Sequence, residues 1–406
     1  MFELIRANKR RAVILMVAMV ILLMALGYGL GLAFWHQPIA GLIIAAIVWT
    51  VLALMTWFQG DAMILAASGA RKIEKKDHPM LFNVVEEMTI AAGLPKVPEV
   101  YILDVEAPNA FATGRNPERA KIAVTAGLLE RLNRDELQGV IGHEIGHVAN
   151  RDVLYMMIAT VMIGAIVMLA DIGLYSFIFG GVAGGRRTSS SSGGGGQAQA
   201  IMMIVALMLV ILAPIIAQLL YFALSRRREY LADASSARYT RYPEGLARAL
   251  EKISSNTVKM PQANRATAAL YIANPLKTSA RGLADLSSTH PPISKRVKIL
   301  RAMEGDTGYA GYDAAFKQVN GRAGGVMPSA AVKDTQPQPA RAASAAALDS
   351  PVERKRTTAN ALWSAQGYRF IQCPCGVKLK VPPRFPKDVV TCPNCGRDHA
   401  VDVNGR

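Results

Sequence analysis

Four long apolar runs constrain the fold of this chain more than any other feature. They cover residues 12–35, 39–58, 153–180 and 200–224 of the 406 residues. Each is long enough to cross a lipid bilayer, which takes about 20 consecutive apolar residues. The first run could instead belong to a cleaved signal peptide. It is long for one, lacks a clear small-residue cleavage site, and only His36-Gln37-Pro38 separates it from the second run. We therefore predict two transmembrane hairpins.

Basic residues beside these runs predict the orientation. Lysine and arginine gather on the cytoplasmic side of membrane proteins, and here they flank the first and fourth runs, at Arg6, Lys9, Arg10, Arg11, Arg226, Arg227 and Arg228. Arg186 and Arg187, between the third and fourth runs, count mildly against this orientation. The balance predicts a multi-pass protein of the cell inner membrane with both termini in the cytoplasm. The net charge of +16 suits contact with anionic lipid, so we expect no nucleic-acid partner.

A metal-binding motif lies between the second and third runs. His143, Glu144 and His147 form the pattern H-E-x-x-H. Residues four apart share one face of a helix, so both imidazoles can bind one metal ion. A catalytic zinc ion takes three protein ligands and keeps one position for water, and Glu144 is placed to accept a proton from that water. The alternative is a chance match in an ordinary helix.

The topology predicts the third ligand. The third and fourth runs must be antiparallel because their soluble flanks share a side, so the segments next to them lie side by side. His147 is about six residues before the membrane edge, and Glu229 is about five residues beyond it, or roughly 9 Å and 7.5 Å along a helix. We therefore predict Glu229 as a zinc ligand and Asp233 as the residue that orients a ligating histidine. The alternative is a solvated helix face that pairs with nearby arginines.

The remaining segments predict a mostly helical α+β membrane protein with a small sheet. Strands are expected at residues 97–103, 108–114 and 121–125. Residues 304–360 are rich in Ala, Gly and Pro with little periodicity, which predicts a disordered linker. The expected membrane units are a first transmembrane hairpin at residues 1–59 and a second at 153–224. A soluble domain is expected in two parts, at residues 60–152 and 225–303. The linker at 304–360 and a C-terminal module at 361–406 follow.

The C-terminal module carries all four cysteines, Cys373, Cys375, Cys392 and Cys395. Two cysteine pairs, each closed by glycine, resemble a zinc ribbon, although the first pair is C-x-C and not the usual C-x-x-C. We predict a structural zinc ion there. A disulfide pair and free thiols are the alternatives, and the predicted cytoplasmic location disfavours a disulfide. The module could bind substrate, a protein partner or nucleic acid, and its basic character does not choose among them.

These motifs together resemble the HtpX-type membrane zinc metalloproteases of the gluzincin group. The similar stretches are residues 109–114, 124–129, 143–147, 226–233 and 290–291, within about residues 1–300. The resemblance implies a cytoplasmic gluzincin-like domain that cleaves misfolded or damaged membrane proteins in quality control. It implies Glu144 as the catalytic acid and base, Glu229 as a zinc ligand, and His290 and Arg296 near the substrate carbonyl. For His290, a polar cap at a helix start is the alternative.

Two other functions stay open at this point. One is a catalytically idle membrane scaffold that recruits partners through the ribbon, which the intact Glu144 disfavours. The other is a protease that processes lipidated C-terminal peptides, for which four spans are few. For the favoured protease we expect membrane-protein or peptide substrates, contact with the bilayer, and a possible protein partner at the ribbon. An extended substrate could align on an edge strand around residues 110–113.

Overall fold

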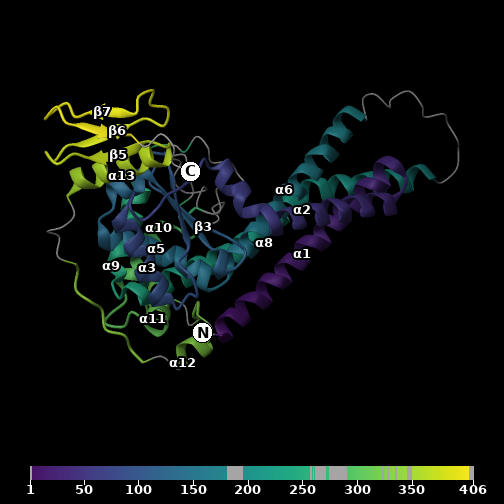
Figure 1. Cartoon of the computed structure of the whole chain (residues 1–406). Helices are drawn as coiled ribbons and strands as arrows, with labels where there is room; N and C mark the ends of the chain where they lie inside the picture. The colour runs from purple at the N-terminus through teal and green to yellow at the C-terminus, as the bar shows by residue number, and fades with distance from the viewer. Residues whose placement is uncertain are drawn as a thin grey trace.

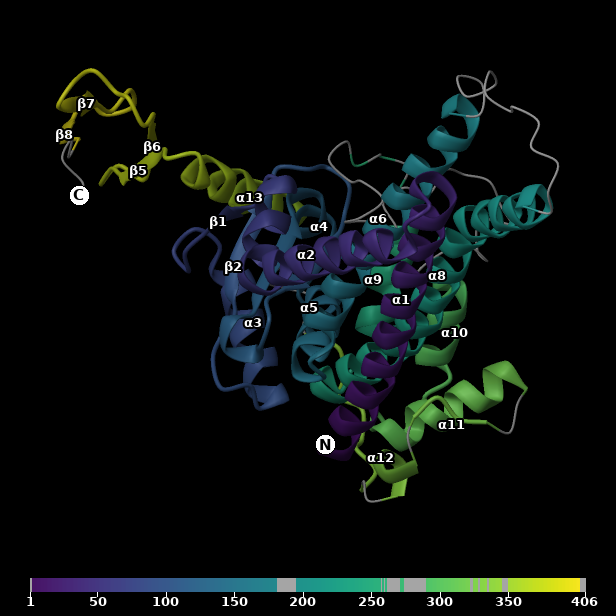
Figure 2. The ribbon, with the colours of Figure 1, turned by 90° about the vertical axis from the view of Figure 1, so that its right-hand side faces the viewer.

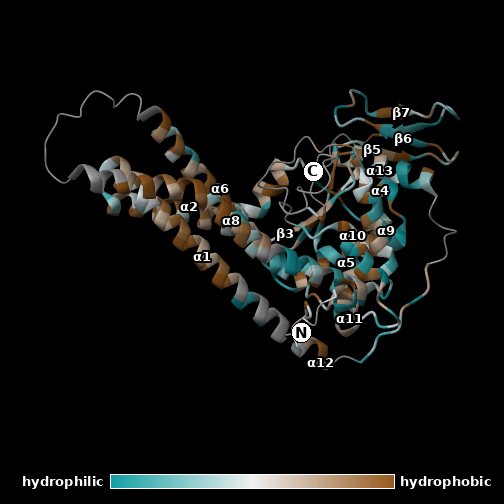
Figure 3. Ribbon diagram, turned by 180° about the vertical axis from the view of Figure 1, so that it is seen from behind, coloured by the Kyte–Doolittle hydropathy of each residue, from teal (hydrophilic) through white to brown (hydrophobic). Residues whose placement is uncertain are grey.

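The computed structural model describes residues 2–180, 195–256, 258, 260, 271–273, 290–321, 324–327, 329–333, 336–344 and 350–401. A bundle of long helices projects from a body of shorter helices and a small sheet, and the C-terminal strands lie on the side of that body away from the bundle (Figure 1). The bundle is mostly hydrophobic along its length, whereas the body is mixed (Figure 3).

Four of the described helices are long and apolar enough to cross a membrane, as predicted. They are α1 (Phe2–Trp35), α2 (Pro38–Ala67), α6 (Asp152–Tyr175) and α8 (Gly195–Thr240). Helix α6 continues into a short π-helix, η2 (Ser176–Gly180). The body ends of the two apolar segments in α6 and α8 lie next to each other, as predicted from antiparallel spans, and Arg228 donates through Nη1 to the Asp152 carbonyl at 3.1 Å. Helix α8 extends past its apolar part into the body, so one continuous helix joins the two.

A four-stranded sheet lies in the body. Its strands are β1 (Arg71–Lys72), β2 (Glu99–Leu103), β3 (Ala110–Thr113) and β4 (Lys121–Thr125), in the order β1-β2-β4-β3. Strands β2 and β4 are parallel, whereas β3 runs antiparallel to β4. The three predicted strands are confirmed, and the two-residue β1 was not predicted. Strand β3 forms one edge of the sheet, as expected for a strand that would align a peptide.

Helices pack around α5, which carries the H-E-x-x-H motif. The helices of the body are α3 (Pro79–Ala92), the 3₁₀ turn η1 (Pro117–Arg119), α4 (Ala126–Arg131), α5 (Arg134–Ala149), α9 (Pro243–Ser254) and α10 (Ile293–Arg301). Leu137, Val140 and Ile141 of α5 are fully buried in the main core. Helix α5 packs against α3, α8 and α9, so the motif lies in the middle of the body and not on its surface.

The predicted disordered linker is wrong for the part of residues 304–360 that the structure describes. Helices α11 (Tyr309–Asn320), α12 (Ser329–Lys333) and α13 (Pro351–Ala365) lie within it or overlap its end. Tyr309 and Tyr312 are at most 2% exposed and pack into the main core. Composition failed here because a few aromatic side chains at helical spacing anchor an otherwise Ala- and Gly-rich segment.

The C-terminal module consists of two hairpins that follow α13 (Figure 2). The first pairs β5 (Arg369–Gln372) with β6 (Lys378–Val381), and the second pairs β7 (Val389–Thr391) with β8 (Asp398–Ala400). Each turn carries two cysteines and a glycine with positive φ, Gly376 at 89° and Gly396 at 70°. Glycine adopts this left-handed conformation without steric cost. The Lys380 ammonium lies 3.5 Å from the Trp363 ring centroid, which fixes the module to α13.

Candidate metal centre

The sequence at the start of α5 fixes where this helix begins. Asn133 accepts a hydrogen bond from the Glu136 backbone, and the Glu136 carboxylate accepts one from the Asn133 backbone. This reciprocal capping satisfies two backbone donors that a helix start otherwise leaves without partners. The start of α5 is therefore set nine residues before His143, and the motif lies on a regular helix.

Two glycines let α5 approach α8 closely. A Cβ atom on Gly142 would lie 3.2 Å from Ser236 Oγ, and one on Gly146 would lie 3.0 Å from Ser235 Cβ. Ser236 Oγ also donates to the Gly139 carbonyl at 2.6 Å. Small residues on both helices thus bring the histidines of α5 within reach of the acidic residues of α8.

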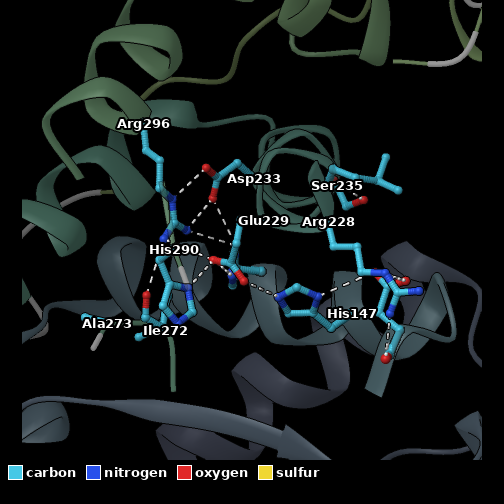
Figure 4. Close-up of polar contacts among 12 residues, drawn as sticks. His147, Arg228, Glu229, Asp233, Ser235, Ile272, Ala273, His290 and Arg296 are labelled. Carbon is cyan, nitrogen blue, oxygen red and sulfur yellow. Dashed lines mark hydrogen bonds and ion pairs between the residues drawn. The ribbon is translucent and has the colours of Figure 1, made fainter. Parts of the chain in front are cut away.

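His143, His147 and Glu229 converge on one point. Their candidate ligand atoms all lie within 4.8 Å of one another. Glu229 Oε2 is 3.6 Å from His143 Nε2, and Glu229 Oε1 is 3.4 Å from His147 Nε2. Figure 4 shows Glu229 between His147 and His290. The structure therefore brings together the three residues that the sequence predicted as ligands.

One unsatisfied polar atom shows that this donor set fits a metal ion. His143 Nε2 is buried and makes no hydrogen bond within the described part of the chain. Buried polar atoms almost always have a partner, and this nitrogen faces Glu229 Oε2 at 3.6 Å. Two imidazole nitrogens and one carboxylate are a donor set that zinc takes in catalytic sites.

Asp233 lies behind His143, where the sequence predicted it. Its Oδ1 is 3.0 Å from His143 Nδ1, and both groups are fully buried. A carboxylate on this nitrogen fixes the imidazole so that Nε2 points toward Glu229.

Arg296 is buried against the same carboxylate. Its Nε and Nη2 donate to Asp233 at 2.8 and 2.6 Å, and its Nη1 lies 3.3 Å from Glu229 Oε2. The resemblance implies a place near a substrate carbonyl, which stays a prediction; the structure shows a fully buried guanidinium that contacts both acidic residues. Its side chain compensates their charge.

His290 and the predicted ligand Glu229 are neighbours. His290 Nδ1 lies 2.9 Å from Glu229 Oε2, and both side chains are at most 5% exposed. The structure thus brings His290 to the centre from a segment 61 residues later in the sequence.

Asp152 and Arg228 also belong to the site, and the sequence patterns did not predict either of them. Asp152 Oδ2 lies 3.6 Å from His147 Nδ1, and Arg228 Nε lies 3.5 Å from Asp152 Oδ1. Asp152 begins an apolar run, so it looked like a boundary residue. The signal was its position five residues after His147, across the break at Arg151, which has a left-handed φ of 57°.

Burial and neighbouring charges shift the pKa values of the motif. Burial raises the pKa of Glu144 to about 7, and the charge of His147 is the largest effect that opposes this shift. Burial lowers the pKa of His143 to about 4. Burial also lowers that of His147, but the Asp152 and Glu229 carboxylates outweigh it and raise its pKa to about 10.

The edge of β3 is partly covered by the chain itself. The Ile272 backbone donates to the Ala110 carbonyl at 3.0 Å, and the Ile272 carbonyl accepts from Arg296 Nη1 at 3.3 Å. Tyr271 packs edge-on against Phe111, with ring centroids 5.1 Å apart. A peptide added to β3 would therefore pair beyond Ala110, at the residues nearest Glu144.

The four cysteines form a second cluster. Cys373 Sγ is 3.4 Å from Cys395 Sγ, and Cys375 Sγ is 3.6 Å from Cys392 Sγ. All four are free thiols whose sulfur atoms lie within 4.8 Å of one another. Tetrahedral zinc with Zn–S distances of about 2.3 Å separates its sulfur ligands by about 3.8 Å, so this cluster could hold such an ion.

This protein has membrane-length helices, and a centre of two histidines and one glutamate lies at their ends. These features define its class, the membrane metalloproteases. The chain belongs to peptidase family M48, whose family model matches residues 75–304. Helices α11 to α13 and the cysteine module lie beyond the matched residues.

Two relatives of known name and one solved structure are similar to this chain. "Protease HtpX homolog" of Dictyoglomus thermophilum is 44% identical over 302 residues, which cover 74% of this chain and 94% of that protein. The protein of the same name from Streptococcus gordonii is 42% identical over 303 residues, 75% of this chain and 100% of that protein. The solved structure of Ste24p from S. mikatae matches with a TM-score of 0.40 and 18% identity over 74% of this chain and 67% of that chain.

Proposed function

We propose that this membrane metalloprotease is an endopeptidase that cleaves misfolded or damaged membrane proteins at the cytoplasmic face of the cell inner membrane. The observation that carries the proposal is the convergence of His143, His147 and Glu229 beside Glu144, at the body end of two membrane-length helices. Helix α8 carries Glu229 without a break, and α5 is separated from α6 only by Asn150 and Arg151. A centre at that position meets polypeptide that emerges from the bilayer. The names of the relatives support proteolysis, and the basic residues beside the first and fourth runs support the cytoplasmic side. The quality-control role is what the resemblance to the HtpX-type proteases implies.

The ligands proposed for the catalytic zinc ion are His143, His147 and Glu229, and Asp233 would orient His143. When bound there, zinc supplies Lewis-acid chemistry that polarises a scissile carbonyl and makes water acidic. Glu144 acts as general base on the attacking water and then delivers the proton to the leaving nitrogen.

Other residues of the site prepare the substrate. The edge of β3 beyond Ala110 aligns an extended peptide by strand addition. His290, which lies 2.9 Å from Glu229, is the side chain proposed to face the carbonyl oxygen as charge develops on it. Arg296 holds Asp233 and Glu229 in place through the contacts described above.

The test is a pair of variants assayed in detergent on an unfolded membrane protein. Glu144→Gln should bind one catalytic zinc ion like the wild type and lose cleavage, because only the base is removed. His143→Ala should lose both zinc and cleavage. Zinc is measured by elemental analysis and cleavage by product gels, with and without a chelator. Cleavage by Glu144→Gln at the wild-type rate would contradict the assignment, and wild-type protein without chelator-sensitive cleavage would favour the idle scaffold. A prenylated peptide in the same assay tests the lipidated-substrate alternative.

We also propose that Cys373, Cys375, Cys392 and Cys395 bind a structural zinc ion. Four thiol sulfurs within 4.8 Å of one another support this site. Full-length protein should then contain two zinc ions per chain, and Cys392→Ser or a chain that ends before residue 369 should contain one. A stoichiometry that stays at one for the full-length protein would refute the second site. We also propose that this C-terminal module binds a protein partner.

A further inference from the structure

Residues 336–344, here called the strap, connect the ends of the two metal-bearing helices. Helix α5 runs toward its neighbouring span α6, and α8 runs away from its own apolar part, so the start of α5 and the end of α8 lie at the same end of the pair. The strap reaches both. Its Arg341 backbone donates to the Arg241 carbonyl at 2.8 Å, and Ser344 donates to Asp135 through its backbone at 2.8 Å and its hydroxyl at 2.6 Å.

Arg341 makes the largest set of these contacts. Its Nη2 donates to Asp135 Oδ1 at 2.8 Å and to Gln138 Oε1 at 2.7 Å, both in the first turns of α5. Its Nε donates to the Thr240 carbonyl, the last residue of α8, at 2.9 Å. The guanidinium also lies 5.0 Å from the Tyr242 ring centroid. One side chain therefore bonds both helices at once.

Charge favours this arrangement. The last carbonyls of a helix lack partners within the helix and carry partial negative charge, which a cation stabilises. Asp135 is an acidic residue in the first turn of α5, where negative charge is favoured. Arg341 lies between them with 29% of its side chain exposed, so its ion pair is partly shielded from solvent.

Residues 307–312 lie earlier in the chain than the strap and reach the side chains beside the metal centre. Tyr312 donates to Asp233 Oδ2 at 3.5 Å, and the Tyr309 hydroxyl lies 3.2 Å from Ser235 Oγ. The backbone and hydroxyl of Thr307 donate to the Gln338 carbonyl at 2.8 and 3.1 Å, which joins this region to the strap. Residues beyond position 304 thus contact α8 both next to the centre and at the end of the helix.

We propose that Arg341 is a positioning residue for the metal centre, so that the strap beyond the family match is a working part of the protease. The proposal rests on the proposed zinc ligands. His143 and His147 are on α5 and Glu229 is on α8, and ligand distances must hold to about 0.2 Å for a metal site. Between the metal centre and the strap end of the pair, α5 and α8 contact each other through small residues such as Gly139, Gly142 and Ser236. Arg341 closes those ends and stops α5 and α8 from shifting against each other.

The test compares Arg341→Ala with Arg301→Ala in the full-length protein in detergent. Arg301 is a matched control because it also makes several charge-assisted bonds, to Glu244 and Glu251 at 2.8–3.0 Å, but these link α10 to α9. Zinc affinity is measured by competition with a chelating dye, kcat and KM with a peptide substrate, and unfolding by a thermal scan. All assays are run well below the unfolding temperature of each variant.

We expect Arg341→Ala to weaken zinc binding about tenfold, at the lower end of the range for outer residues of metal sites, and to lower kcat with KM unchanged. Arg341→Lys keeps the charge but not the planar guanidinium with its several donors, so its zinc affinity and kcat should lie between those of the wild type and Arg341→Ala. Arg301→Ala should match the wild type in zinc affinity and kcat. Wild-type zinc affinity in Arg341→Ala, or an equal loss in Arg301→Ala, would overturn the proposal.

The test of Arg341 does not depend on proteolytic activity, and it can still be carried out if Arg341→Ala does not fold. Zinc binding needs no proteolysis, so absent peptide cleavage would refute the proposed function while the affinity comparison still judges Arg341. Should Arg341→Ala not fold, Asp135→Asn removes the same ion pair from the α5 side. It must then show the same loss of zinc affinity, and a wild-type affinity would overturn the proposal.

Discussion

Replacing Gly146 by alanine tests whether the separation of α5 and α8 sets the metal centre. The added Cβ would lie 3.0 Å from Ser235 Cβ and 3.3 Å from both Cα and O of Ala232. Favourable carbon contacts lie at about 3.5–4.0 Å, so α8 must move away by about 0.5 Å. The atoms met are mostly backbone or Cβ, which cannot rotate aside. Ala232 is three residues from Glu229, so the proposed ligand moves with it.

Two magnitudes follow for Gly146→Ala. Overpacking costs about 1–3 kcal/mol and the helix propensity of alanine returns about 1 kcal/mol, so the free energy of unfolding should fall by at most about 2 kcal/mol. Zinc affinity should fall further, by about 10- to 100-fold, because the shift exceeds the tolerance of about 0.2 Å for ligand distances.

The assay measures zinc affinity by chelator competition and stability by thermal unfolding in detergent. Gly164→Ala in α6 is the control, since nothing lies within 4 Å of the added Cβ. We expect wild-type zinc affinity for Gly164→Ala. If Gly146→Ala also keeps wild-type affinity, helix separation does not control the ligands, and the reasoning is refuted.

Two further predictions concern acidic residues. Asp233→Asn leaves the Arg296 charge poorly compensated, so thermal unfolding should show a loss of about 3–5 kcal/mol, and adding Arg296→Met should recover part of that stability but not the zinc affinity. Burial raises the pKa of Asp135, but hydrogen bonds from Ser344 and Arg341 outweigh it and lower the pKa. The stability difference between wild type and Asp135→Asn should therefore be constant above about pH 5 and shrink as pH falls below about 4, and a difference unchanged at pH 3 would contradict this.

Strong local patterns predicted the membrane helices and the place of the ligands. Apolar runs have few alternative structures, and the i, i+4 spacing of His143 and His147 needs only one helix. Glu229 followed from antiparallel spans and the helical rise, and the structure brings it to both histidines. The spans and the proximity of these three residues could be predicted because each depends on one element or on two joined by the membrane; that the three residues bind zinc stays a prediction.

Long-range packing was not predictable in the same way. Arg296 is buried because Asp233 faces it across two helices 63 residues apart in the chain, a pairing that no local pattern shows. The ordered part of residues 304–360 depends on Tyr309 and Tyr312, two aromatic residues in a segment that composition marks as a linker. Asp152 was hidden because it starts an apolar run.

The length of α8 links lipid to chemistry. This single helix of 46 residues carries both its apolar part and Glu229, and no break separates them. A helix changes its tilt when the hydrocarbon layer becomes thicker or thinner. The part of α8 from Pro214 to Thr240 contains no further proline, so a tilt of this part displaces its far end most. The position of Glu229 therefore depends on bilayer thickness. The activity of a protease with such a helix would change with the lipid composition around it.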